Sequence, residues 1–573
     1  MPDLKKFFLE PETTAQRQYE ALRAHFVDGL PQAEAAARFG YTPGSFRVML
    51  HRLRNQEKLE FFLESRHPGP DKAVDPVRQR IVALRKQNLS AYDIADLLQV
   101  DGRDLSVSAI AGILREEGFA KLPRRRNDDR PGRSGPEAAE PADARRLDLK
   151  PRSFSTRFGG LFLFVPDMVN LNLDSVVDGL DLPGTKMIPA AHAIRSLLAL
   201  KLFGDARHTH VMSDVFDPGL ALFAGLNVIP KSSFLTQYSC RVDPAVYPKL
   251  YRNWFDALAG QGWQHGDSFD LDFHTIPFHG EDALVEKHYV SKRSRRQKGL
   301  LAFVVSDARN RTFCYVDADV CKNRMNDQVI AFAEFWRDKS GQWPRELVFD
   351  SKLTTYAHMN QLNHNGIRFL TLRRRSSGVI KQIHQAPSSA WRRIQLANVA
   401  RKYRTPKILE TRLELKAYDG PLRQIAIKDL GHEQPTILIT NDMSGSPAKL
   451  IQRYARRMII ENNIADTIDF FHMDALSSTV AMKVNCDLAI TVIASCLYRL
   501  LAGRIANNYQ TAEFRRIFRD FIRATARVCI DENGIDVYYQ KRAHNPILLQ
   551  AEYDKTEIRV PWLGGKKLRL HFG

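Results

Sequence analysis

The stretch Phe269-Asp270-Leu271-Asp272-Phe273 places two acids inside an apolar run that predicts a buried β-strand. From this point the pattern favours strands, which we expect at residues 269–273, 300–306, 312–317, 346–350 and 367–372. Helices are expected between the third and fourth strands and between the fourth and fifth, at residues 327–339 and 354–363. The order βββαβαβ, with helices resuming at residue 449, predicts a mixed α/β core.

Three carboxylates fall in this pattern on a strand, at a strand end and on a later helix. They are Asp272 in the first strand, Asp350 at the end of the fourth strand, and Glu461. Magnesium prefers hard oxygen ligands, and a pair of ions about 3.5–4 Å apart can activate an attacking oxygen and stabilise a leaving one. We therefore predict a two-metal phosphoryl-transfer site held by these three acids. Asp270 shares the strand face of Asp272 and stays an alternative to it.

The predicted helix around Glu461 reads Tyr454-Ala455-Arg456-Arg457-Met458-Ile459-Ile460-Glu461. Offsets of three, four and seven residues place Tyr454, Arg457 and Glu461 on one helix face. A hydroxyl, a guanidinium and a carboxylate are therefore expected to point the same way.

With these motifs, residues 260–510 resemble the DDE insertion-sequence transposases with a ribonuclease-H-like, retroviral-integrase-like core. The resemblance is to the subgroup marked by Y-x2-R-x3-E-x6-K. It implies that Asp272, Asp350 and Glu461 form the catalytic triad, and that Tyr454 and Arg457 lie near the transposon end. One position differs from the subgroup pattern. Seven residues after Glu461, where the subgroup has Lys, this chain has Ile468, so the Lys contact to the transferred strand is missing or is supplied by another residue.

Composition favours a polyanionic partner. The chain has 573 residues, a formal net charge of +19 and a pI of about 9.6. Such an excess of basic residues is typical of proteins that bind nucleic acid, although a merely soluble basic protein is the alternative. None of the six cysteines forms a C-x2-C pair, which argues against a zinc ribbon or a disulfide framework.

The first DNA-binding candidate lies near the N-terminus. Thr42-Pro43 is a good start for the third helix of a helix-turn-helix. Polar and basic side chains on that helix suit base edges and phosphates, namely Arg47, His51, Arg52 and Arg54. A small structural three-helix domain is the alternative. A second module of similar pattern follows at residues 63–120.

Further basic residues flank the acids. We expect phosphate contacts from Lys292, Arg293, Arg295, Arg296, Lys298, Arg373 and Arg374, although such runs are usually solvated faces.

These patterns predict a multidomain α+β protein. Helix-turn-helix domains are expected at residues 1–62 and 63–120, a flexible linker at 121–151, and a helical DNA-binding or dimerisation domain at 152–262. A ribonuclease-H-like α/β core is expected in two parts, 263–373 and 446–510, interrupted by a β-rich insertion at 374–445 and followed by a C-terminal region at 511–573.

The resemblance implies a cut-and-paste transposase that binds the terminal inverted repeats of its element, cleaves the ends and joins them to target DNA. It implies two Mg²⁺ ions per site, with Mn²⁺ substituting. The expected partners are double-stranded DNA, namely the terminal inverted repeats and the target DNA, and a second copy of the chain. A catalytically idle DNA-binding regulator and a DNA nuclease without strand transfer are the alternatives.

The N-terminus has no apolar signal core, and the apolar run at 488–501 is too short to span a bilayer, so we expect a bacterial cytoplasmic, nucleoid-associated protein.

Overall fold

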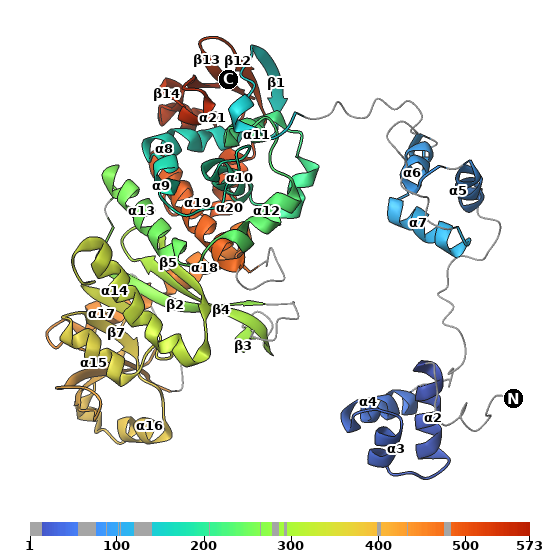
Figure 1. The fold of residues 1–573 in the computed structure, drawn as a ribbon. Helices are drawn as coiled ribbons and strands as arrows, with labels where there is room; N and C mark the ends of the chain where they lie inside the picture. Colours follow the sequence, from blue (N-terminus) through green and yellow to red (C-terminus); the bar gives the residue numbers. More distant parts are fainter. Residues whose placement is uncertain are drawn as a thin grey trace. The chain divides into compact units, whose positions relative to one another are not determined.

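The computed structural model describes residues 14–55, 76–119 and 140–573, with short gaps (Figure 1). The gaps are residues 88, 101, 104, 206, 264, 278–285, 291–294, 398–402, 432–433 and 475–482. The chain divides into two compact units, Met1–Ser134 and Gly135–Gly573.

The first unit begins with three short helices, as predicted. They are α2 Thr14–Phe26, α3 Gln32–Arg38 and α4 Pro43–Arg54. The Thr42 hydroxyl oxygen accepts the backbone N–H of Ser45 at 3.2 Å and so caps α4. The side chains of Phe46 and Leu50 on α4 are buried against the other two helices, which leaves the opposite face of α4 in solvent.

A second group of three helices follows in the same unit. It comprises α5 Pro76–Lys86, α6 Ala91–Val100 and α7 Val107–Glu116. A capping box begins α6, because the backbone N–H of Ser90 donates to Asp93 at 2.9 Å and that of Asp93 donates to Ser90 at 3.3 Å. The group has its own small core, which includes Ile81, Ile94 and Ile110.

The second unit is organised around one large mixed sheet. Its central strands are β2 Ser268–Pro277, β4 Arg295–Asp307, β5 Phe313–Val320, β6 Glu346–Phe349 and β7 Arg368–Leu372. Their spatial order is β5-β4-β2-β6-β7, in which the β2, β6 and β7 neighbours run parallel and the others antiparallel. All five predicted strands are confirmed, in one mixed sheet.

Both predicted helices of the core are also confirmed, as α14 Gln328–Ser340 and α15 Tyr356–His364. The apolar side of α14 packs on β2, where the Phe269 ring lies 4.5 Å from Trp336 and 5.1 Å from Phe332 between centroids. This packing fixes which face of β2 is buried under α14, so Asp270 and Asp272 lie on the other face.

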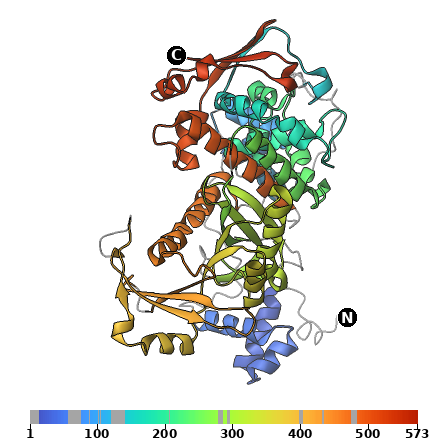
Figure 2. The same ribbon diagram turned by 90° about the vertical axis from the view of Figure 1, so that its left-hand side faces the viewer.

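The β-rich segment after β7 extends the same sheet. It contains α16 Ser377–His384, β8 Arg392–Arg393, β9 Lys407–Leu413, β10 Leu422–Lys428 and β11 Thr436–Thr440. Strand β11 pairs antiparallel with β7, and β10, β9 and β8 follow outward, while β3 Lys287–Val290 pairs with β4 at the other side. In Figures 1 and 2 this segment lies at the end of the unit opposite the C-terminal strands.

The predicted helical block and the C-terminal region share one core. The block contains α8 Val165–Asn170, α9 Leu173–Val177, α10 Ala190–Leu202, α11 Pro218–Ala224, α12 Ser232–Tyr238 and α13 Val246–Gly260. Its first strand, β1 Arg152–Thr156, pairs with β12 Ala526–Ile530 in a sheet completed by β13 Gly534–Tyr539, β14 Glu557–Arg559 and β15 Lys567–Phe572. Two segments that we expected as separate regions thus form a single structural body.

The helix α19 Lys483–Ile505 joins this body to the central sheet. It contacts α10, α13 and β5, and side chains in its middle, such as Cys496 and Tyr498, are fully buried. Its apolar stretch is long enough to cross a membrane by length and composition, but 78% of that stretch is buried inside the protein. We therefore regard α19 as a core helix.

Part of the predicted linker is packed rather than free. Residues 121–139 lie outside the described part of the chain. Residues 140–150 pack within the second unit, where Asp143 is buried and the backbone N–H of Asp148 donates to Asn227 at 2.7 Å. Ala144, Leu147 and Leu149 also pack against the large hydrophobic core, which the polar composition of the segment did not indicate.

The contact between Gly160 and Ile522 gives a test of the shared core. A Cβ added at Gly160 would overlap the backbone of Ile522, whereas one added at Gly503, on an exposed position of α19, would meet nothing within 4 Å. We expect Gly160→Ala to lower the free energy of unfolding by about 2–3 kcal/mol, because overpacking displaces backbone. Gly503→Ala should leave it unchanged or raise it by about 0.5–1 kcal/mol. Equal denaturation midpoints for the two variants would contradict this packing.

Candidate active site

Two parallel strands bring Asp272 and Asp350 to the same edge of the sheet. The register of β2 and β6 pairs Leu271 with Phe349, and the two acids are the next residues along the chain. Parallel neighbours lie about 4.8 Å apart, and residues in register point to the same face. The carboxylates are therefore side by side, each also accepting the backbone N–H of the following residue, at 2.8 Å for Asp272 and 2.6 Å for Asp350.

The helix that carries the third acid is divided at Arg457. We expected one helix through residues 454–461, but the structure has α17 Pro447–Arg456 followed by α18 Met458–Phe471. The backbone N–H of Arg457 donates to Tyr454, and that of Ile460 donates to Arg457, both at 2.9 Å. These three-residue spacings tighten the chain locally, as in a 3₁₀ turn. Tyr454 thus lies on α17, whereas Glu461 lies in the first turn of α18.

Arg457 links the acid on the helix to the acid on the strand. Its Nη1 lies 3.1 Å from Asp272 Oδ2, and its Nη2 lies 2.7 Å from Glu461 Oε1. The residue is only 8% exposed. The Tyr454 ring lies on the same guanidinium, 5.6 Å from centroid to guanidinium carbon. The predicted group of hydroxyl, guanidinium and carboxylate therefore comes together despite the break between the helices.

The electrostatics of these groups reflect their burial and their proximity. Burial raises the pKa of Asp272 to about 6; Arg457 opposes this shift, and the charges of Glu461 and Asp350 add to it. Burial lowers the pKa of Arg457, but Asp272 and the other nearby acids outweigh it and hold that pKa above its usual value. Burial also raises the pKa of Tyr454 to about 12. All three acids are thus close enough to influence one another.

Asp270, the alternative to Asp272, has a different environment. The Arg453 guanidinium donates to Asp270 Oδ1 and Glu346 Oε2, both at 2.7 Å, and to the Ser268 hydroxyl at 2.9 Å. Asp270 is 4% exposed, and its burial raises its pKa while Arg453 opposes the shift. Asp270 and Asp272 are thus each paired with an arginine, but only Asp272 lies beside Asp350 and shares its arginine with Glu461. The arrangement favours Asp272 as the acid that acts with Asp350 and Glu461.

Sequence reasoning missed Arg453. The sequence did contain a signal for it. Arg453 and Arg457 are four residues apart on a helix, and Asp270 and Asp272 are two residues apart on the facing strand, so the two pairs are separated by similar distances.

The acids suit a divalent metal by their chemistry, because carboxylate oxygens are the ligands that Mg²⁺ and Mn²⁺ prefer. Among the residues that the structure describes, no three His, Cys, Asp or Glu side chains are already grouped as a metal site. The Arg457 guanidinium occupies the space between Asp272 and Glu461 and satisfies both carboxylates. Metal binding by these acids would therefore require Arg457 to give up at least one of its ion pairs.

The predicted DNA-contacting residues fall in several places. Arg47, His51, Arg52 and Arg54 are all exposed on α4. Arg373 and Arg374 directly follow β7 and so lie at the same sheet edge as Asp350, although Arg373 donates to the side chain of Gln424.

The other predicted contacts lie near the start of β4. Arg296 is exposed and Lys298 is half-buried, whereas Lys292, Arg293 and the side chain of Arg295 lie outside the described part of the chain.

Ile468, which stands at the Lys position of the subgroup, is part of the hydrophobic core and only 6% exposed. This position on α18 faces the protein interior and not the acids.

Comparison with known proteins places the acids within a recognised domain. Residues 263–497 match the family described as the transposase DDE domain. No curated protein matches the chain. Among solved structures, the crystal structure of a pre-cleavage Mos1 transpososome is similar at 10% identity over 62% of this chain and 77% of that chain, with a TM-score of 0.13, which is too low to support any argument. The similarity to the transposase DDE domain is therefore one of residues 263–497, a segment that includes Asp272, Asp350 and Glu461.

Proposed function

We propose that this protein binds the terminal inverted repeats of its own element, cleaves the DNA ends and joins them to target DNA by cut-and-paste transposition. The observation that carries the proposal is the meeting of Asp272, Asp350 and Glu461 around Arg457 inside a transposase DDE domain. A strand, a strand end and a helix supply the acids, in the order that a DDE site requires.

In this proposal the three carboxylates hold two divalent ions, Mg²⁺ or Mn²⁺. When bound, such ions activate the attacking oxygen and stabilise the leaving oxygen of a phosphodiester. Arg457, once freed from one of these carboxylates, would be able to donate to a DNA phosphate, for which its planar fork is suited. Tyr454 remains against the guanidinium and limits where it can point.

Sequence-specific binding is assigned to the first unit, and in particular to the exposed face of α4. Arg296, Lys298, Arg373 and Arg374 would contact phosphates close to the acids. Because two element ends must be joined together, we propose that the chain acts as a homodimer in the synaptic complex. It would do so in the cytoplasm, at the nucleoid.

A DNA nuclease without strand transfer is the alternative that one observation favours. The subgroup's Lys contacts the transferred strand, but Ile468 at that position is buried in the core. An assay of strand transfer with the element ends separates the two functions.

The carboxylate roles can be tested by isosteric substitution. We expect Asp272→Asn, Asp350→Asn and Glu461→Gln each to lower the nicking rate by about 10³-fold or more, because a metal-ion contribution of several kcal/mol is removed. End binding in gel shifts should stay close to that of the native protein. Asp270→Asn serves as the comparison. If it abolished nicking while Asp272→Asn did not, Asp270 would replace Asp272 in the triad.

The role of α4 can be tested through the salt dependence of end binding. We expect the triple variant R47A/R52A/R54A to bind more weakly, with a log–log salt slope flatter by about 0.9 for each phosphate that the helix no longer neutralises. The matched control removes three exposed lysines of the second unit, in K231A/K541A/K555A. An unchanged footprint and salt slope in the α4 variant would show that this helix does not touch the DNA.

The dual role of Arg457 can be tested with and without metal. In EDTA, Arg457→Ala should lower the free energy of unfolding by about 2–4 kcal/mol, because two neighbouring carboxylates are left without their partner. Mg²⁺ should restore part of this stability by binding the freed acids. The control is Arg453→Ala, which breaks a similar ion pair one helical turn away, at Asp270 and Glu346, and should not respond to Mg²⁺. Equal responses of the two variants to Mg²⁺ would refute the assignment.

A further inference from the structure

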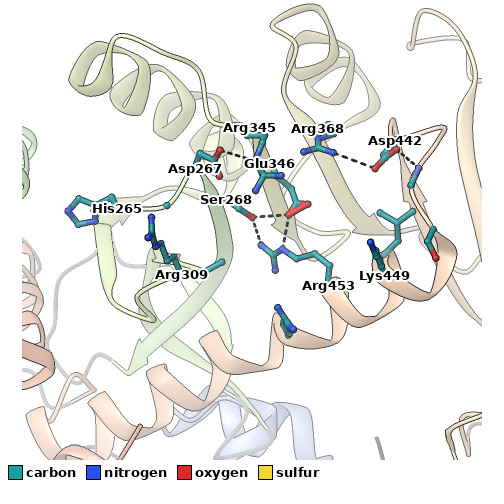
Figure 3. Close-up of a pocket in the computed structure, with 16 residues that line it drawn as sticks. His265, Asp267, Ser268, Arg309, Arg345, Glu346, Arg368, Asp442, Lys449 and Arg453 are labelled. Carbon is teal, nitrogen blue, oxygen red and sulfur yellow. Dashed lines mark hydrogen bonds and ion pairs between the residues drawn. The ribbon is translucent and has the colours of Figure 1, made fainter. Parts of the chain in front are cut away.

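A cavity of about 710 Å³ opens at the end of the sheet opposite the acids (Figure 3). It is lined by Ser268, Glu346 and Arg368, which lie at the starts of β2, β6 and β7. Asp350 follows the other end of β6. Because a strand rises about 3.3 Å per residue, the cavity and the acid edge are separated by roughly 13 Å along β6.

The lining of this cavity is strongly basic. It contains six cationic side chains, from Arg309, Arg345, Arg368, Lys449, Arg453 and Arg456, and three carboxylates, from Asp267, Glu346 and Asp442. With His265 neutral, its formal charge is +3. An open cavity with this charge attracts anions.

The three carboxylates are each engaged by one of the arginines. Arg345 lies 2.8 Å from Asp267, Arg453 lies 2.7 Å from Glu346, and Arg368 lies 3.7 Å from Asp442. Figure 3 shows Arg453 and Arg368 turned towards these partners.

The other three cations, Arg309, Lys449 and Arg456, are exposed. Within the described part of the chain they make no side-chain hydrogen bond or ion pair. They are therefore available to an anion from outside. The ten-residue helix α17 begins beside them, after Ser446, and its N-terminal end adds partial positive charge.

The lining also indicates what kind of anion fits. Among its sixteen residues, Leu450 is the only large apolar side chain and His265 the only ring. The cavity therefore offers a nucleotide base few aromatic or apolar side chains for stacking or burial. Guanidinium and ammonium groups spread along an open rim suit the repeating phosphates of a nucleic-acid backbone instead.

We propose that this cavity, with Arg309, Lys449 and Arg456 at its rim, binds the phosphodiester backbone of duplex DNA. This contact deepens the proposed function and rests on its claim that the chain binds DNA, but it takes no part in phosphoryl transfer and needs no metal at the acids. It gives the DDE domain a second DNA-binding edge, on the opposite side of the sheet from Asp272 and Asp350.

The first test is the salt dependence of duplex binding by the full chain carrying Asp272→Asn, in which nicking is not measured. Adding R309Q/K449Q/R456Q should flatten the log–log salt slope by about two to three units, because up to three phosphates are no longer neutralised. Adding K231Q/K541Q/K555Q, which removes the same charge from exposed positions elsewhere, should leave the slope unchanged. Circular dichroism and thermal melting confirm that both variants are folded.

The second test locates the DNA. A benzophenone side chain introduced at Ser446, on the cavity lining, should cross-link to the duplex, and millimolar inorganic phosphate should not displace it. The same probe at exposed Glu532, in the turn between β12 and β13, is the control. An unchanged salt slope, a yield at Ser446 no higher than at Glu532, or full displacement by free phosphate would each overturn the proposal. None of these outcomes depends on whether the acids catalyse transposition.

Discussion

The docking of α17 and α18 on β2 depends on a match between the spacing of side chains along the strand and their spacing along the helix. Two residues along a strand span about 6.6 Å, and four residues along a helix span about 6 Å. Asp270 and Asp272 therefore face Arg453 and Arg457 as two consecutive ion pairs, at 2.7 and 3.1 Å. Buried charges are costly unless they are paired, so this double contact fixes both the rotation and the position of the helix along the strand. Glu461 reaches the acid edge as a consequence.

The parts of this arrangement that depend on neighbouring residues could be predicted from the sequence. Apolar runs of strand length locate β2 and β6, and because each acid lies in or directly after such a run, its place at the sheet edge follows. The caps of α4 and α6 are equally local, since Thr42, Ser90 and Asp93 bond within three residues of themselves. The order of strands and helices was then enough to indicate the core.

Features that depend on distant contacts could not be predicted in this way. The pairing of β1 with β12 joins residues as far apart as Ser153 and Cys529. Neither strand has a sequence pattern that indicates which strand it pairs with. The break at Arg457 also escaped prediction, because the residues around it favour a helix and Arg457 pairs there with Asp272, which is distant in the sequence. The basic cavity combines residues from five separate segments, most of which look like ordinary solvated charges when read alone.

The pairing of β1 with β12 also determines when the second unit can be completed during synthesis. Ser153 and Cys529 are 376 residues apart, which corresponds to roughly 20–75 s of translation at about 5–20 residues per second. Throughout that interval β1 has no partner strand, and the groove that receives Ile522 beside Gly160 stays open. The segments with the acids leave the ribosome earlier, but the body that supports them closes only with its final strands. A nascent chain therefore presents its two N-terminal three-helix groups well before it can present a finished second unit.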